Sequence, residues 1–200
     1  MNDVQQAQLQ PYLRVFAPPL ASFTMPFTPF HMGAAMVLKP AATTRFSLIA
    51  FGLAQIIIDI EPGIGMLRGL PVLHGPSHTV IGALFIAGLA YLITPSCSRF
   101  ILNRWNQELR FHKIEWLVEL PTPGNGAIAF GALFGTLSHI FLDSLMHDDI
   151  HPLAPFSDAN PLLHLMSHEA VYEWCVVGGV VGTLAWLWRK RADHMKSVKA

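Results

Sequence analysis

The feature that most restricts this chain is a series of long stretches without Asp, Glu, Lys or Arg. Five such stretches cover residues 15–38, 46–58, 69–98, 120–142 and 174–188. A bilayer-spanning helix needs about 20 mostly apolar residues. Of the 200 residues, 52% are hydrophobic and only 13% are charged, against roughly 25% charged in a soluble domain. The sequence therefore predicts an all-α, polytopic membrane bundle of about four to five membrane segments.

Three of the stretches predict full spans. Within 69–98 the expected helix covers residues 78–93, because prolines bound it at positions 76 and 95. Within 120–142 the helix is expected to begin after Gly124. The last stretch becomes long enough if residues 169–173 form its first turn, with tryptophans and an Arg-Lys-Arg run as its interfacial anchor.

The remaining segments are shorter or mixed. Prolines interrupt 15–38, so we expect only a short helix over 30–38, then a turn and a helix over 46–60. Residues 98–120 alternate charges with large apolar side chains, a pattern typical of an amphipathic helix on the membrane surface. The predicted organisation is a Pro-rich lead-in (1–29), a membrane-embedded helical domain (30–190) and a basic cytoplasmic tail (191–200).

Charge placement predicts the orientation and excludes one class of partner. Lys and Arg favour cytoplasmic loops, and they gather at 39–45, 99–113 and 189–199, which share one side if the helices alternate. The C-terminus is therefore expected in the cytoplasm. The formal net charge is +0, so no basic field exists to attract nucleic acid.

Ten histidines stand among these few charges. A histidine in an apolar chain needs a partner and is often a metal ligand. In the predicted topology, eight of the ten fall at non-cytoplasmic helix ends or loops: His31, His74, His78, His139, His147, His151, His164 and His168. The alternative is that these are polar residues tolerated near lipid headgroups without any metal.

Spacing and apolar neighbours in the sequence predict which of these side chains are metal ligands. His139 and Asp143 stand four residues apart and share one helix face. Asp59 and Glu61 follow three isoleucines, where an unpaired carboxylate would cost several kcal/mol. A metal or Arg68 must therefore compensate them. The predicted ligands of a divalent ion are His31, Asp59, His78, His139 and Asp143, and the predicted base or orienting residues are His74, Glu61 and His147.

These residues also form an ordered set of motifs. In chain order they are His31, Asp59-x-Glu61, His74-Gly-Pro-Ser-His78-Thr79, Ser138-His139-x3-Asp143 and Pro152-Leu-Ala-Pro155-Phe-Ser. Over residues 27–190 this order resembles the family of inner-membrane metal-dependent hydrolases that includes the LexA-regulated members. Gly75 stands where that family often has Arg, and Glu61 replaces a second Asp. The family's ligand order is similar to that of the zinc-dependent phospholipases C.

The resemblance implies a bacterial inner-membrane protein with one or two divalent ions, zinc being the metal expected. Such an ion can activate a water for attack on a phosphoester of a small-molecule, lipid or lipid-linked substrate. No Gly-x-Ser-x-Gly elbow occurs, so we expect no covalent intermediate on the protein. His74 is the favoured general base. The alternatives are a metal or proton transporter and a non-catalytic membrane scaffold that holds a structural metal.

Overall fold

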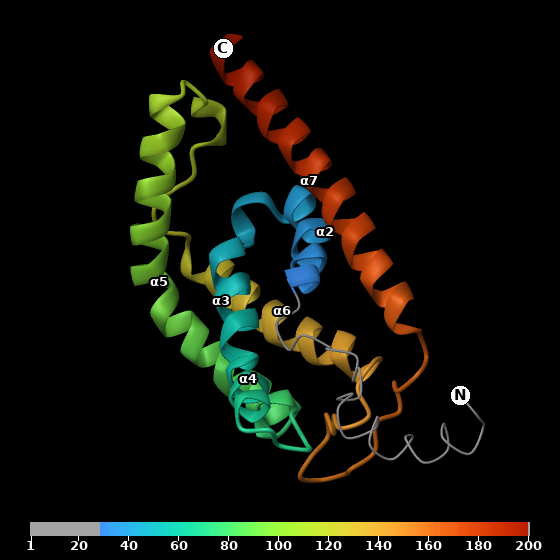
Figure 1. Cartoon of the computed structure of the whole chain (residues 1–200). Coiled ribbons are helices and arrows are strands. Elements are labelled where there is room, and N and C mark those ends of the chain that lie inside the picture. The colour runs from blue at the N-terminus through green and yellow to red at the C-terminus, as the bar shows by residue number, and fades with distance from the viewer. Residues whose placement is uncertain (1–28, 200) are drawn as a thin grey trace, which may run out of the picture.

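The computed structural model describes residues 29–199, which form helices and loops without a strand (Figure 1). The helices are Met32–Ala42 (α2), Leu48–Ile58 (α3), Ile60–Leu67 (α4), Val80–Phe111 (α5), Asn125–Ser144 (α6) and His168–Lys199 (α7). Short 3-10 turns cover Pro29–His31 (η1), Thr43–Arg45 (η2), Pro76–His78 (η3) and Glu115–Leu117 (η4). Apart from its last residue, the predicted lead-in lies outside the described residues.

Four helical segments are long and apolar enough to cross a membrane. They are Leu48–Leu67, which joins α3 to α4, and the helices α5, α6 and α7. Their outward surfaces stay apolar, with Phe85, Leu92 and Trp188 each more than 70% exposed, as expected for side chains that face lipid. The predicted all-α membrane bundle is confirmed.

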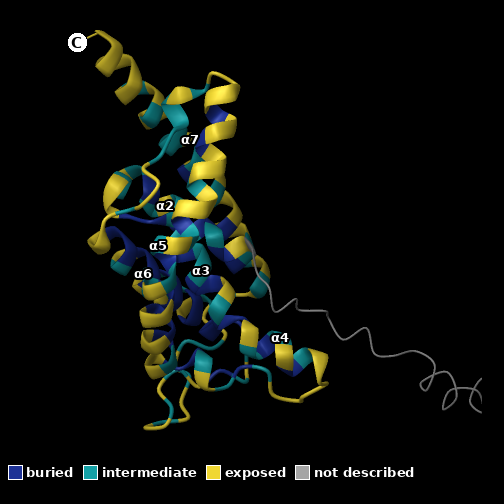
Figure 2. Ribbon diagram, turned by 90° about the vertical axis from the view of Figure 1, so that its left-hand side faces the viewer, coloured by how far each residue is buried: buried dark blue, intermediate teal, exposed yellow. Residues whose placement is uncertain are grey.

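The short helices lie between the two long ones. Figure 1 shows α5 on one side and α7 on the other, with α2, α3 and α6 between them. Helix α2 packs on α7, and α3 packs on both α5 and α6. Small buried side chains such as Ala54, Ala90 and Ala132 line the central contact and let the helix backbones approach closely. Figure 2 shows buried residues gathered in this interior and exposed residues on the outer surfaces.

Helices α2 and α7 meet through glycine. A Cβ atom added at Gly182 of α7 would collide with the backbone carbonyl of Met36 in α2, and one at Gly33 would collide with the carbonyl of Cys175. Only a residue without a side chain allows this approach. The short helix α2 is therefore held against a full span.

Helix α5 corrects the prediction of a span ending at Ile93 and a separate surface helix over 98–120. It runs unbroken through Pro95 to Phe111, because a proline within an apolar span is tolerated where packing holds the helix. The Asn106 side chain then binds both backbone groups of Glu119. Residues 112–120 therefore fold back against α5 as a loop that contains η4.

Three other helical segments also extend beyond their predicted ends, and one of them is α7, which continues through most of the predicted tail to Lys199. Helix α2 continues through Pro40 to Ala42, and the ammonium of Lys39 caps the following turn by donating to the carbonyls of Thr43 and Phe46, at 2.9 and 3.0 Å. The chain bends at Asp59 and continues as α4 to Leu67. Pro62 is compatible with this extension because it lies in the first turn of α4.

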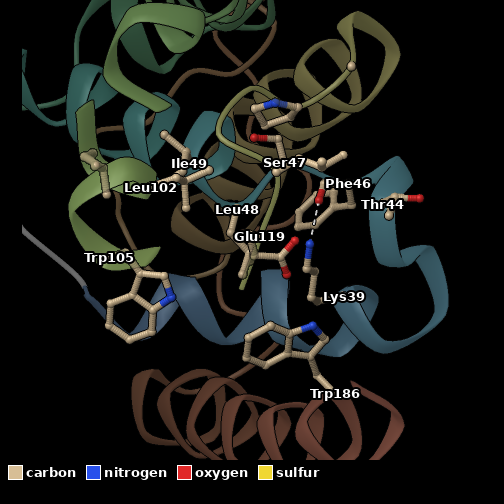
Figure 3. Close-up of a pocket in the computed structure, with 14 residues that line it drawn as sticks. Lys39, Thr44, Phe46, Ser47, Leu48, Ile49, Leu102, Trp105, Glu119 and Trp186 are labelled. Atoms are coloured by element: carbon tan, nitrogen blue, oxygen red, sulfur yellow. Dashed lines mark hydrogen bonds between the residues drawn. The ribbon is translucent and has the colours of Figure 1, made fainter. Parts of the chain in front are cut away.

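The three basic segments meet at one end of the bundle. Lys190 of α7 pairs with Glu119 at 2.9 Å and donates to the carbonyl of Val118. Figure 3 shows Lys39, Glu119 and Trp186 around a pocket of about 330 Å³ at this end. The segments at 39–45, 98–120 and 189–199 therefore share one end, as the alternating topology requires. That this end faces the cytoplasm stays a prediction.

Candidate metal centre

The five predicted ligands converge at the other end of the bundle, although they come from separate elements. His31 ends η1, Asp59 lies at the junction of α3 and α4, His78 ends η3, and His139 and Asp143 lie on α6. None of the five is more than 4% exposed. Alternation of the helices explains the convergence, because each of these chain positions lies at the same end of its helix.

Asp143 and His139 form the middle of the cluster. The Nε2 atom of His139 lies 3.0 Å from Oδ1 of Asp59 and 2.9 Å from Oδ2 of Asp143. Asp143 also lies near two other imidazoles, with its Oδ1 at 3.4 Å from Nε2 of His31 and its Oδ2 at 3.5 Å from Nε2 of His78. Donor atoms from Asp59, His78, His139 and Asp143 all lie within 4.8 Å of one another.

The donor atoms of this cluster lack hydrogen-bond partners. The Nε2 atoms of His31, His78 and His139 and the Oδ1 atom of Asp143 are buried and unpaired in the described part of the chain. Leaving such groups unsatisfied costs about 1–3 kcal/mol each, and more when the group is charged. A cation held by Asp59, His78, His139 and Asp143 would pair the Nε2 atoms of His78 and His139 at once, so the residues present fit a metal ion.

Gln55 fixes which nitrogen of His139 faces this centre. Its side-chain Nε2 donates to the carbonyl of Gly135 at 2.9 Å, which turns its Oε1 toward Nδ1 of His139. A carbonyl oxygen can only accept, so Nδ1 carries the proton. Nε2 is therefore the nitrogen that faces the two carboxylates, the orientation that a metal-binding imidazole requires.

Ser77 does the same for His78. Its hydroxyl donates to the carbonyl of Ile58 at 3.2 Å and accepts from Nδ1 of His78 at 2.9 Å. In the neutral ring the Nε2 atom of His78 then carries no proton. Burial lowers the pKa of His78, although Asp143 opposes the shift. A neutral imidazole is the form that binds a metal.

A second cluster adjoins the first. Nδ1 of His74 lies 2.7 Å from Oδ1 of Asp149, and the other carboxylate oxygen accepts from the backbone N–H groups of Leu73 and His74. Partial burial would raise the pKa of Asp149, but these hydrogen bonds lower it to about 2. His147 completes the group, with donor atoms of all three residues within 4.8 Å. Burial lowers the pKa of His147.

The imidazole rings of the two clusters are in contact with one another. Ring centroids are 4.7 Å apart for His74 and His78, and 4.5 Å apart for His74 and His147. Including the outer pairs, the rings follow in the order His31, His139, His78, His74, His147 and His168. The two clusters therefore form one continuous group of packed imidazoles.

Glu61 lies beside the centre without joining the metal-binding groups among the described residues. Its Oε2 accepts from the backbone N–H of Ser77 at 2.7 Å, and its other oxygen packs against Gly75, where a Cβ would stand 2.5 Å away. The carboxylate thus holds the turn that carries His78. Arg68, the alternative partner for these carboxylates, forms no ion pair in residues 29–199.

The other histidines divide between the site and the surface. His151 donates from Nδ1 to the carbonyl of Asp158 at 2.7 Å, and an exposed His164 lies 3.3 Å from Asp148. His168 begins α7, and its ring lies 5.8 Å from that of His147. The two histidines expected outside the site, His112 and His194, are exposed and lie beyond it.

Sequence reasoning missed three residues that orient the site. Gln55 is a single polar residue in an otherwise apolar helix, which was a detectable signal. Asp149 follows His147 and Asp148 in an acidic loop, and its partner His74 is 75 positions away. Ser77 lies between two predicted site residues, but its role depends on the carbonyl of Ile58, which only the fold brings near.

Comparison with family models, curated proteins and solved structures finds no match to this chain.

Proposed function

We propose that this chain is a membrane-bound metal-dependent hydrolase that cleaves a phosphoester. The observation that carries the proposal is the convergence of unpaired imidazole nitrogens and carboxylate oxygens at one buried point, with an oriented His74–Asp149 pair beside it. The motif order that resembles the inner-membrane hydrolases supports the same reading.

Asp59, His78, His139 and Asp143 would hold the metal, with His31 at the edge of the same site. Imidazole and carboxylate donors suit zinc, which we propose as the ion. When bound, such an ion lowers the pKa of a coordinated water and polarises a phosphoryl oxygen. The second cluster, His74, His147 and Asp149, lies beside this site and would supply the base and the carboxylate that orients it.

His74 is the proposed general base. Asp149 accepts from its Nδ1, which leaves the Nε2 lone pair available, and no hydrogen bond to that Nε2 occurs in residues 29–199. In the reaction a water oxygen forms a bond to phosphorus while the ester P–O bond breaks. The water proton passes to Nε2 of His74, and a proton returns to the leaving oxygen.

We further propose that the site opens on the non-cytoplasmic face of a bacterial inner membrane. The basic segments gather at the opposite end of the bundle, and basic loops favour the cytoplasm. The C-terminus would then lie in the cytoplasm.

Transport of protons or metal ions is the second candidate function. The contact between successive imidazole rings from His31 to His168 favours it, because histidine chains can relay protons. The position of the donors at helix ends favours hydrolysis, since transport sites lie near the middle of the bilayer on broken helices. Ion flux into liposomes that contain the purified protein tests this alternative directly.

Turnover with retained metal tests the hydrolase proposal. Zinc-loaded wild-type protein is assayed on phosphomonoesters, phosphodiesters and carboxyl esters. The test variant is Asp149→Asn, and its matched control is Asp148→Asn. An amide at position 149 keeps the shape but disturbs the His74 tautomer, so Asp149→Asn should lose at least about 100-fold in kcat with unchanged zinc content. Asp148 is exposed, and its ion pair within residues 29–199 is with the exposed His164, so its variant should match wild type. No turnover of any ester by zinc-loaded protein would overturn the proposal.

A further inference from the structure

A cleft of about 540 Å³ opens beside His74. Its walls come from the loop before α5, the first turn of α5 and the loop after Ile150. The residues that line its apolar part include Val72, Pro76, Ile81, Ala154 and Pro155. This size is within the range of small-molecule sites.

Two imidazoles supply the polar atoms of the cleft that remain available. His74 and His151 both line it, and each has its Nδ1 bound to an oxygen acceptor, Asp149 and the carbonyl of Asp158. Each ring therefore keeps an Nε2 lone pair free of these bonds. The hydroxyl of Thr79 is already paired with the carbonyl of Pro76 and the N–H of Gly82. The cleft thus combines a polar region near the metal centre with apolar walls.

The apolar walls continue onto the lipid-facing side of a span. Ile81, Phe85 and Leu92 fall on one face of α5 by their spacing, and they are 51, 77 and 73% exposed. Val72, another residue that lines the cleft, is also exposed. A hydrocarbon chain that enters the cleft from the bilayer would meet these apolar side chains. A substrate that arrives from water would gain nothing from such a path.

We propose that the cleft binds the hydrocarbon chain of a membrane amphiphile whose phosphate group lies at the polar end of the cleft, next to the proposed metal centre and the proposed base His74. That this amphiphile is also cleaved rests on the proposed function, but its binding in the cleft can be measured without turnover. Ile81→Trp should fill the cleft, and Leu92→Trp is its matched control because it adds the same ring to the same helix face, away from the cleft.

Photolabelling of the full chain in nanodiscs tests occupancy. The probe is dodecyl phosphate with a diazirine at the chain end, and labelled peptides are mapped with and without excess unlabelled dodecyl phosphate. Labelling of residues 72–82 and 151–155 should be competed by dodecyl phosphate. Loss of only two buried methylenes, about 0.8 kcal/mol each, corresponds to about tenfold in affinity, so Ile81→Trp should lose at least that much competed labelling. Leu92→Trp should stay within about twofold.

Labelling spread over all spans and insensitive to competitor would overturn the proposal, whether or not Ile81→Trp folds. A rate comparison between two esters distinguishes failure of the amphiphile proposal from failure of the proposed hydrolase function. Aryl phosphodiesters with ethyl or dodecyl chains share one reacting centre, and the dodecyl ester should have the higher kcat/KM. Equal rates would refute the amphiphile and leave the hydrolase standing. Competed labelling without turnover of either ester would support the cleft and refute the hydrolase.

Discussion

Replacement of Gln55 by leucine should weaken metal binding although Gln55 touches no metal. In the wild-type chain its Oε1 holds the proton on Nδ1 of His139, and its own orientation is fixed by Gly135. Leucine fits an apolar helix but accepts no hydrogen bond. His139 would then be free to take the other tautomer, which places a proton on the metal-binding Nε2.

The magnitude follows from the burial of this pair. Gln55 is 7% exposed and His139 is fully buried, so water cannot replace the lost acceptor. A buried donor left unpaired costs about 1–3 kcal/mol, and loss of such a supporting partner typically costs 10–100-fold in metal affinity. Both arguments predict a loss of about 10- to 100-fold for Gln55→Leu.

Zinc affinity is measured by competition with a chelator of known affinity, and the helical fold is checked by circular dichroism. Gln107→Leu is the matched control, because it makes the same substitution at an exposed glutamine on α5. If Gln55→Leu folds and binds zinc within twofold of both wild type and this control, the assigned role of Gln55 is wrong.

Three further predictions concern the ligands, the helix contact and acid. Asp143→Ala should abolish both zinc binding and turnover, whereas His74→Ala should lose about 10²–10⁴-fold in kcat and keep its zinc; equal zinc contents would contradict these roles. Gly182→Ala should destabilise the bundle by about 1–3 kcal/mol in detergent unfolding, because the new Cβ meets the backbone of α2, whereas Gly88→Ala adds a Cβ with nothing within 4 Å and should be neutral or stabilising. Because the pKa of Asp149 is lowered to about 2, its stabilising contribution is complete above the ordinary value of 3.8 and is lost as pH falls toward 2. The stability gap between wild type and Asp149→Asn should therefore shrink from pH 5 to pH 2, and a constant gap would contradict the assignment.

The buried cluster was predictable because its residues follow local rules. His139 and Asp143 share a face through i, i+4 spacing, and alternation of helices brings Asp59 and His78 to the same end. The supporting shell was not predictable in this way. The partners of Gln55 and Asp149 are 84 and 75 positions distant, and no local pattern encodes such a contact.

Helix ends were the least predictable part of the fold. Pro95 would end a helix in water, but α5 continues through it because neighbouring helices bury Ala90, Thr94 and Ser98 on either side. The charged residues after Ser98 then extend the helix, and Asn106 holds the returning loop. The local sequence predicts correctly that the residues after Ser98 are helical and amphipathic. Tertiary packing makes them a continuation of α5 and not a separate helix.

The proposed metal centre is tested most directly by elemental analysis of the purified, zinc-reconstituted chain after exhaustive dialysis. Wild type should retain at least about one divalent ion per chain, as a single built site requires. Asp143→Asn should retain far less, because its side chain approaches three of the imidazoles. A folded wild-type chain that retains no metal, or an Asp143→Asn chain that retains as much as wild type, would contradict the assignment of these residues as a metal centre.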